Sequence, residues 1–256
     1  MAKVLAITNQ KGGVGKTTTT VNLAASLAAA KKRVLLIDLD PQGNATMGSA
    51  INKADLTITV YDVLIGNKGV REASIYSEAG KYHILPANRE LAGAEIELVD
   101  IDNRETRLKD SLQSVQDDYD FILIDCPPAL NLLTLNGLCA AKSVMIPMQC
   151  EYYALEGLSD LVNTIRKVRA NLNTELQIEG LLRTMYDPRN SLAQQVSDQL
   201  LKHFGDKVYR TVIPRNIRLA EAPSFGLPAL YHDRESRGTQ AYLALAGELM
   251  NNAVAV

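Results

Sequence analysis

The chain has 256 residues, of which 46% are hydrophobic and 22% are charged, and its formal net charge is −2. This composition is typical of a soluble globular protein that buries roughly three quarters of its unfolded surface and needs no metal or disulfide to fold. It excludes a disordered chain. Without a secretory signal or an apolar run of membrane-spanning length, we expect a cytoplasmic protein with no membrane partner.

Short apolar runs and longer amphipathic segments alternate along the whole chain. This alternation predicts an α/β fold with a mostly parallel, twisted sheet and helices on both faces. No repeat or linker interrupts it, so we predict a single domain over 1–256, with no helix-turn-helix module in front of it. The expected strands are 3–8, 33–39, 82–85, 121–125, 143–147, 179–183 and 207–213, and the expected helices are 17–30, 104–116, 131–141, 151–170, 191–203 and 237–252.

The first expected strand leads into the sequence QKGGVGKTT, residues 10–18, which opens the first helix. Glycines let backbone N–H groups point inward, and the start of a helix adds unpaired donors and a positive dipole end. Lys16 is expected to reach the β- and γ-phosphates of ATP, and the Thr17 hydroxyl to bind Mg²⁺. The pattern predicts a P-loop NTPase, and its ATP-binding residues here are Lys11, Gly12, Gly13, Val14, Gly15, Lys16, Thr17 and Thr18.

One position departs from the common phosphate-loop pattern G-x-x-x-x-G-K-[ST]. Gln10 stands where the first glycine is usual, and Lys11 follows it, so the loop carries a second lysine besides Lys16. A lysine at the start of such a loop cannot easily fold back into its own site. Lys11 is therefore a candidate for reaching into the site of a neighbouring subunit.

Two later strands end in acidic residues. One ends with Asp38 and is followed by Asp40, and the other ends with Asp125 after four apolar residues, which is the Walker B pattern. The carboxyl ends of parallel strands meet at one edge of a sheet, where ligands bind. Only one of Asp38 and Asp40 needs to face a metal. We expect these strand ends and the phosphate loop to converge on one site.

The three cysteines, Cys126, Cys139 and Cys150, are odd in number and widely spaced, and no C-x-x-C motif occurs. This pattern predicts free thiols in a reducing compartment rather than a disulfide framework. An iron–sulfur or other metal role is the less favoured interpretation.

Charge is unevenly distributed along the chain. Residues 90–125 carry eleven acidic against three basic side chains, whereas residues 181–237 carry nine basic against six acidic ones. A nearly neutral protein can thus present a basic face in its C-terminal third, as proteins that bind nucleic acid do.

Five segments occur in a fixed order: KGGVGKTT, LIDLDPQGN, ILIDCPP, IPRNIRLAEAPSFGLP and DRESRG. Together they resemble the ParA/Soj chromosome- and plasmid-partition ATPases of the deviant Walker A class, which also includes the MinD-type ATPases. The first segment indicates only the superfamily, whereas IPRN, EAPS and DRESRG narrow the resemblance to small Soj-like proteins. The likeness extends from Lys3 to about Gly247.

This resemblance implies an ATP-dependent switch. Two ATP-bound subunits are expected to form a homodimer in which Lys11 acts on the partner's nucleotide. Gly12 matches a glycine at which the subunits approach closely, and Asp40 matches the acid that orients the attacking water. The implied catalytic residues are Lys11, Lys16 and Asp40.

The resemblance also assigns the remaining contacts to ATP and Mg²⁺. Asp38 and Asp125 match magnesium-associated positions, beside Thr17. The segment that borders the adenine base matches Pro214, Arg215 and Asn216.

Partners follow from the same resemblance. The ATP-bound dimer is expected to bind double-stranded DNA without sequence preference and thereby to associate with the nucleoid. A ParB-type centromere-binding protein is expected to stimulate hydrolysis with a short basic N-terminal segment. Arg189 and Arg218 match DNA-binding positions, and weaker candidates are Lys202, Lys207, Arg215, Arg234 and Arg237.

Three alternatives remain open. A ParA-like ATPase could position another cargo, such as an organelle or a protein cluster, on the nucleoid. A MinD-like membrane-associated ATPase is disfavoured because ALAGELMNNAVAV, residues 244–256, contains no Lys or Arg for anionic lipid. A metabolic P-loop enzyme, such as a dethiobiotin synthetase-like ligase, lacks a supporting substrate motif.

Overall fold

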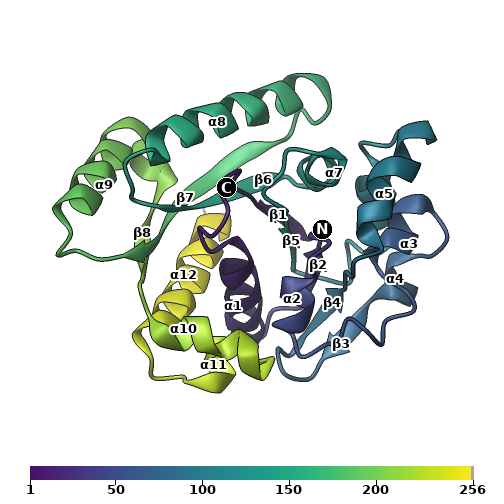
Figure 1. Ribbon diagram of the computed structural model, residues 1–256, viewed down its shortest axis with the longest axis horizontal. Helices are drawn as coiled ribbons and strands as arrows, with labels where there is room; N and C mark the ends of the chain where they lie inside the picture. The colour runs from purple at the N-terminus through teal and green to yellow at the C-terminus, as the bar shows by residue number, and fades with distance from the viewer. Residues whose placement is uncertain (255–256) are drawn as a thin grey trace.

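One eight-stranded sheet forms the centre of the molecule, in the order β3-β4-β2-β5-β1-β6-β7-β8 (Figure 1). The computed structural model describes residues 1–254, so the last two residues of the predicted domain lie outside the described range. All neighbouring strands are parallel except β3 and β4, which are antiparallel, and this confirms the predicted mostly parallel sheet. The strands are β1 (Lys3–Ile7), β2 (Val34–Asp38), β3 (Ile75–Ser77), β4 (Tyr82–Leu85), β5 (Phe121–Asp125), β6 (Ser143–Gln149), β7 (Gln177–Tyr186) and β8 (Val208–Pro214).

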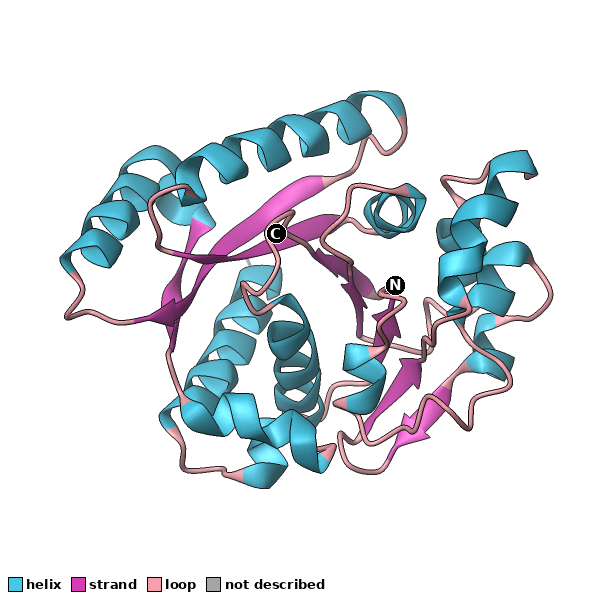
Figure 2. Cartoon of the chain, in the orientation of Figure 1, coloured by secondary structure: helices cyan, strands magenta, loops and turns pink. Residues whose placement is uncertain are grey.

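Helices cover both faces of this sheet, as Figure 2 shows. One face is covered by α1 (Lys16–Ala29), α2 (Asn44–Met47), α10 (Ile217–Glu221), α11 (Ala229–His232) and α12 (Arg237–Val254). The other is covered by α3 (Val60–Ile65), α4 (Val70–Ala73), α5 (Leu91–Glu97), α6 (Arg107–Leu112), α7 (Leu132–Ala140), α8 (Ala154–Asn171) and α9 (Ser191–Phe204). Short 3₁₀ turns occur at Leu98–Asp100, Gly205–Lys207 and Ala222–Phe225. No helix within residues 1–254 is both long and apolar enough to cross a membrane.

The sheet separates two apolar cores, and successive strand residues belong to different ones. In β2, Leu35 and Ile37 pack in the core below α3–α9, whereas Leu36 packs in the core below α1 and α12. Side chains alternate across a strand, so a strand covered on both faces must be apolar at every position. This is why the buried strands read as continuous apolar runs in the sequence.

The predicted strands all occur, with boundaries that differ by a few residues. The strand expected at 179–183 is longer, Gln177–Tyr186, and the helix expected at 104–116 is shorter, Arg107–Leu112. Sequence reasoning missed β3 and the short helices α2–α5, α10 and α11. Each of these has at most seven residues, too few for a helical or strand period to stand out.

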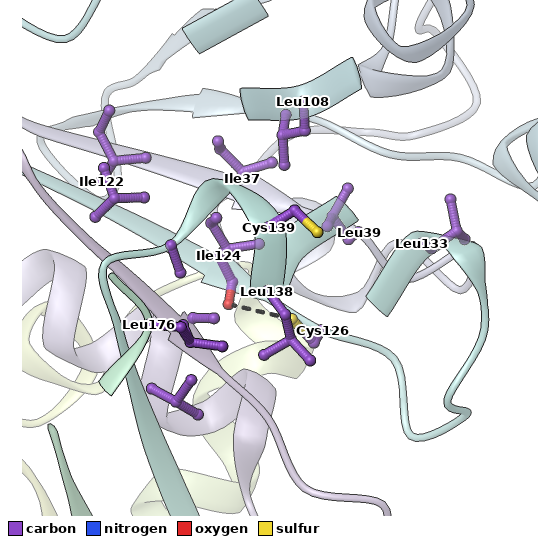
Figure 3. Packing of buried hydrophobic residues seen from close by; sticks show 14 of the residues in the cluster. Ile37, Leu39, Leu108, Ile122, Ile124, Cys126, Leu133, Leu138, Cys139 and Leu176 are labelled. Atoms are coloured by element: carbon purple, nitrogen blue, oxygen red, sulfur yellow. Dashed lines mark hydrogen bonds between the residues drawn. The ribbon is translucent and has the colours of Figure 1, made fainter. Parts of the chain in front are cut away.

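All three cysteines are free and buried, as predicted. Cys126 and Cys139 lie in the core between α7 and the strands β2 and β5 (Figure 3). Burial raises the pKa of the Cys139 thiol to about 11 and that of Cys150 to about 11, so both stay protonated near neutral pH.

Two helical glycines differ sharply in the space around them, and this generates a stability prediction. A methyl group at Gly137 of α7 would lie 2.9 Å from Cys126 Sγ and 3.2 Å from Leu39 Cδ1, whereas one at Gly157 of α8 meets nothing within 4 Å. We expect Gly137→Ala to lower the free energy of unfolding by about 1–3 kcal/mol because it overpacks the core. Gly157→Ala should raise it by about 0.5–1 kcal/mol, since alanine favours a helix. Urea titration of both variants tests this, and equal effects of the two would contradict it.

Candidate nucleotide-binding site

The phosphate loop connects β1 to α1 and has the backbone geometry of an anion-binding turn. Gly13 and Gly15 adopt φ of +73° and +88°, a region that side chains other than glycine rarely tolerate. Gly15 is the N-cap of α1, and no side chain caps the first turn of this helix. Its first N–H groups, together with the positive end of the helix dipole, are therefore suited to a phosphate.

Neighbouring strands hold this loop in place. The Asn9 amide donates to the carbonyl oxygen of Pro147 at 2.8 Å, and its Oδ1 accepts the Lys11 N–H at 3.0 Å. On the other side, the Thr184 hydroxyl of β7 donates to the carbonyl oxygen of Val14 at 2.7 Å. The loop is thus fixed to β6 and β7 before any ligand binds.

The two loop lysines point to different places. Lys16 is 7% exposed, and its Nζ donates to the carbonyl oxygen of Lys11 at 3.1 Å, inside the loop. Burial lowers the pKa of Lys16, and the Asp125 carboxylate partly offsets this shift. Lys11 instead leaves its own loop and forms an exposed ion pair with Glu151, which follows β6. The role of Lys11 at a partner's nucleotide stays a prediction.

Asp125 ends β5 below the first turn of α1. The Thr17 hydroxyl donates to Asp125 Oδ2 at 2.7 Å, and the Thr20 hydroxyl lies 3.0 Å from Asp125 Oδ1. Asp38 ends β2 and is the register partner of Asp125 across the β2–β5 pair. Burial raises the pKa of Asp125, and the neighbouring Asp38 raises it further.

Asp38 and Asp40 differ in exposure because β2 ends at Asp38, whereas Asp40 lies in the turn that follows. Asp38 is fully buried, and its Oδ2 accepts bonds from both the backbone N–H and the hydroxyl of Thr46, each at 2.8 Å. Burial raises the pKa of Asp38. Asp40 lies in the turn after β2, partly exposed, and its Oδ1 accepts the N–H of Gln42 at 2.9 Å. One oxygen of Asp40 is therefore free to act on another group.

These residues fit a magnesium ion. Mg²⁺ prefers oxygen ligands and binds through one or two carboxylates together with nucleotide phosphates and water. The Thr17 hydroxyl and the Asp125 carboxylate already lie within hydrogen-bond distance of each other. A cation between them would also favour the charged form of two carboxyl groups that burial disfavours.

The segment predicted to border the adenine base lies at the end of β8, which is next to β7 in the sheet. β8 ends at Pro214, which lines a cavity of about 850 Å³ together with Arg215, and with Tyr186 and Asp187 at the end of β7. Tyr186 comes two residues after Thr184, which holds the phosphate loop, but no residue of that loop is among the described residues that line the cavity. Asn216 does not line it; its side chain caps α10 by accepting the N–H of Leu219.

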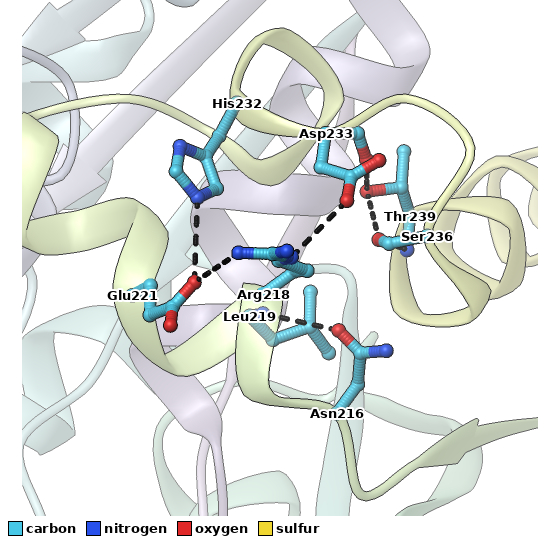
Figure 4. Close-up of polar contacts among 8 residues, drawn as sticks. All are labelled: Asn216, Arg218, Leu219, Glu221, His232, Asp233, Ser236 and Thr239. Carbon is cyan, nitrogen blue, oxygen red and sulfur yellow. Dashed lines mark hydrogen bonds and ion pairs between the residues drawn. The ribbon is translucent and has the colours of Figure 1, made fainter.

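Five of the seven predicted DNA-binding residues lie near the carboxyl ends of β7 and β8. Arg189, Arg215 and Arg237 line the same cavity. Arg218, on α10, pairs with Glu221 and with Asp233, as Figure 4 shows. Arg234 lies in the turn between α11 and α12 and is exposed. The predicted basic residues of this region thus come from three loops, the short helix α10 and the first residue of α12.

Lys202 and Lys207 are not part of this group. α9 connects two parallel strands and must run antiparallel to them, so Lys202, in its last turn, lies near the amino ends of the strands. Lys207 immediately precedes β8 and lines a second cavity there, with Lys3 and Lys142. The full length of β8 separates Lys207 from Arg215, so one surface does not contain all seven.

Sequence reasoning missed four residues that hold the site together. They are Thr20, Thr46, Glu151 and Thr184, which contact Asp125, Asp38, Lys11 and Val14. Only Thr20 leaves a signal in the sequence, because it stands three residues after Thr17 and so faces the same side of α1. Glu151 and Thr184 reach the site from distant segments, whereas Thr46 lies eight residues after Asp38, on the short helix α2 that sequence reasoning missed.

Known proteins are similar to this chain over nearly its whole length. A family model described as an AAA domain matches residues 2–178. The sporulation initiation inhibitor protein Soj of Bacillus subtilis is 57% identical over 98% of this chain and 100% of its own length. The chromosome partitioning protein ParA of Myxococcus xanthus is 51% identical over 98% of this chain and 88% of its own.

Two solved structures share the fold and were determined with nucleotide and magnesium. The cobyrinic acid a,c-diamide synthase from Mycobacterium smegmatis with bound ADP and magnesium is 37% identical, with a TM-score of 0.86 over 98% of this chain and 95% of that chain. The septum site-determining protein MinD from Pyrococcus horikoshii OT3 complexed with Mg-ADP is 27% identical, with a TM-score of 0.80 over 99% of this chain and 98% of that chain. This chain is more similar in sequence to the Soj and ParA proteins above, at 57% and 51% identity, than to either of these two solved structures.

The raised pKa of Asp125 generates a prediction about stability and pH. Without nucleotide and metal, the folded chain keeps a proton on this group at pH values where the unfolded chain has lost it, so the contribution of Asp125 to stability falls as pH rises from about 4 to about 8. Asp125→Asn removes this titration. In thermal unfolding with EDTA, we expect the unfolding temperature of the variant to rise steadily relative to that of the wild type between about pH 5 and about pH 8. Parallel curves for the two proteins over this range would contradict the assignment.

Proposed function

This chain belongs to the Soj/ParA family of chromosome-partitioning ATPases, and within it we propose that the chain is an ATP-dependent switch that binds DNA. In this proposal, ATP binding joins two subunits into a dimer that holds DNA without sequence preference, and hydrolysis releases it. The observation that carries the proposal is the contrast between the two loop lysines: Lys16 lies inside its own phosphate loop and Lys11 lies outside it.

The nucleotide is proposed to bind along the phosphate loop. Backbone N–H groups of residues 11–18 and the Lys16 ammonium would hold the phosphates, and Thr17, Asp38 and Asp125 would hold Mg²⁺ directly or through water. The absence of a side-chain cap on α1 and the convergence of Thr17 on Asp125 support this. Pro214 and Arg215, which line the cavity at the ends of β7 and β8, are proposed to border the adenine base. Bound Mg²⁺ would neutralise charge on the phosphates during hydrolysis.

The homodimer is proposed to depend on Lys11 and Gly12. Lys11 has an exposed carboxylate partner, and exposed pairs of this kind are worth only about 0–1 kcal/mol, so Lys11 can leave Glu151 for a partner's nucleotide. A methyl group built at Gly12 meets nothing within 4 Å in its own chain. We propose that an approaching subunit fills this space, so a bulky residue at Gly12 would block its approach.

Asp40 is proposed to orient the attacking water. It lies in a turn beside the buried pair of carboxylates, and of its two carboxylate oxygens only Oδ1 accepts a backbone hydrogen bond from a described residue. An acid held in this way can accept a hydrogen bond from water without itself being buried. A ParB-type protein with a basic N-terminal segment is the proposed stimulating partner, and the nucleoid is the proposed location. Movement of a different cargo by the same cycle remains the alternative.

DNA binding tests the proposal directly. We would measure binding of two unrelated duplexes with ATP, ADP or no nucleotide, across a series of salt concentrations. The expected result is binding only with ATP, equal for both sequences, and weakened steeply by salt because the contacts are to phosphates. Lys16→Ala is the control that should bind neither ATP nor DNA. An ATP-dependent dimer that binds no DNA in any condition would move the proposed tether to a protein or a membrane.

The role of Asp40 has a separate test. Asp40→Ala should still bind ATP and dimerise, because the phosphate loop and the metal ligands are intact, but its hydrolysis should be at least about tenfold slower. Light scattering after a pulse of ATP should then show a dimer that outlives that of the wild type. A variant that remains monomeric with ATP would count against this role.

A further inference from the structure

The two arginines that best match DNA-binding positions are already paired with carboxylates of their own chain. Arg189 contacts Asp187 twice, through Nε to Oδ1 at 3.0 Å and through a terminal nitrogen to Oδ2 at 2.8 Å. Arg218 contacts Glu221 at 2.8 Å and Asp233 at 3.3 Å. A carboxylate occupies the same face of a guanidinium that a phosphate would use.

The DRESRG turn fixes one of these acids beside Arg218 (Figure 4). The backbone N–H of Asp233 donates to the carbonyl oxygen of Ala229 at 2.8 Å, and its carbonyl oxygen accepts the buried Thr239 hydroxyl at 2.8 Å. Ser236 Oγ in turn accepts the N–H of Thr239, which closes the turn at the start of α12. Asp233 is thus held by backbone and turn contacts that do not involve Arg218.

The acids nearly cancel the charge of the surface. Near the ends of β7 and β8, five arginines (Arg189, Arg215, Arg218, Arg234 and Arg237) stand among four carboxylates (Asp187, Glu221, Asp233 and Glu235), which leaves a net charge of only +1. All the paired groups are partly exposed, with 88% for the Arg189 side chain and 49% for Arg218. Pairs this exposed are weak, so a phosphate can displace them.

We propose that Asp187, Glu221 and Asp233 lower the DNA affinity of a single subunit by competing with DNA phosphates for Arg189 and Arg218. This inference rests on the proposed DNA binding. A subunit of net charge +1 on this surface binds too weakly alone, whereas a dimer places two such surfaces on one duplex and gains by avidity. The three carboxylates therefore determine how strongly DNA binding depends on ATP.

The test uses substitutions that keep the shape of the side chain and remove its charge. The variants are Asp187→Asn, Asp233→Asn and the double variant. In Asp187→Asn, the remaining amide oxygen can still accept the N–H of residue 189 that Asp187 accepts now. Binding of one fluorescent duplex is measured over a salt series, with ATP and without nucleotide. Each single variant should bind DNA about twofold to tenfold more tightly at low salt. The salt slope should steepen by about 0.9 for each arginine that gains a phosphate.

The strongest expectation concerns the double variant without nucleotide. It should bind DNA measurably under salt conditions in which the nucleotide-free wild type does not, so the ratio of affinities with and without ATP should fall. Circular dichroism and thermal unfolding check that each variant keeps the fold.

Two control variants distinguish the loss of an ion pair with arginine from the loss of a negative charge alone. Glu235→Gln adds the same unit of charge in the same cavity, where the described residues give Glu235 no ion pair. Asp206→Asn adds it at the opposite edge of the sheet, beside Lys207. Both should change the affinity and the salt slope less than Asp233→Asn does. If Glu235→Gln matches it, or if affinity falls in the aspartate variants, the competition is refuted. Wild-type protein that binds no DNA with ATP would instead refute the proposed function.

Discussion

The structure depends on an unfavourable juxtaposition: two fully buried carboxyl groups, Asp38 and Asp125, stand side by side in register at the ends of β2 and β5. Burying one such group already disfavours its charge, and burying two beside each other disfavours it further. The chain keeps them because Thr17, Thr20 and Thr46 supply hydroxyl partners, so neither carboxyl lacks a hydrogen bond. A cation bound beside these two carboxyl groups would offset the cost of burying their charges. A nucleotide that brings Mg²⁺ would therefore stabilise the folded state.

α1 connects this buried pair to the C-terminal third of the chain. Its first turn faces Asp125, and Asn22, one turn further, donates to the carbonyl oxygen of Thr18 and accepts the N–H of Ala229 at the start of α11. On the next face, the Thr19 hydroxyl lies 3.1 Å from the buried Tyr242 hydroxyl of α12. α11 and α12 flank the turn that carries Asp233. A helix bonded at both places is a short physical path between the nucleotide site and the basic surface.

Much of the fold could be predicted because its signals are local. A buried parallel strand must be apolar throughout, and a phosphate loop must carry glycines, so β1, β2, β5, β6 and the P-loop left clear patterns. β3 and the short helices α2–α5 did not, because segments of three to seven residues take their structure from the segments they pack against. The same reason explains Thr46, which lies on α2, and Thr184, whose contact with Val14 joins residues far apart in the chain.

The sequence predicts the sign of the charge on the C-terminal surface but not its magnitude. The excess of basic residues over 181–237 is present, but the parallel strands divide it between two edges of the sheet, with Lys207 at one and Arg215 at the other. Acids that are close in sequence then pair with the arginines: Asp187 stands two residues from Arg189, and Glu221 three residues from Arg218. Because a count over a window treats a paired and an unpaired arginine alike, it overestimates the positive field of a surface. Local pairing, which depends on turns such as the one that holds Asp233, therefore decides how much of that charge a phosphate can reach.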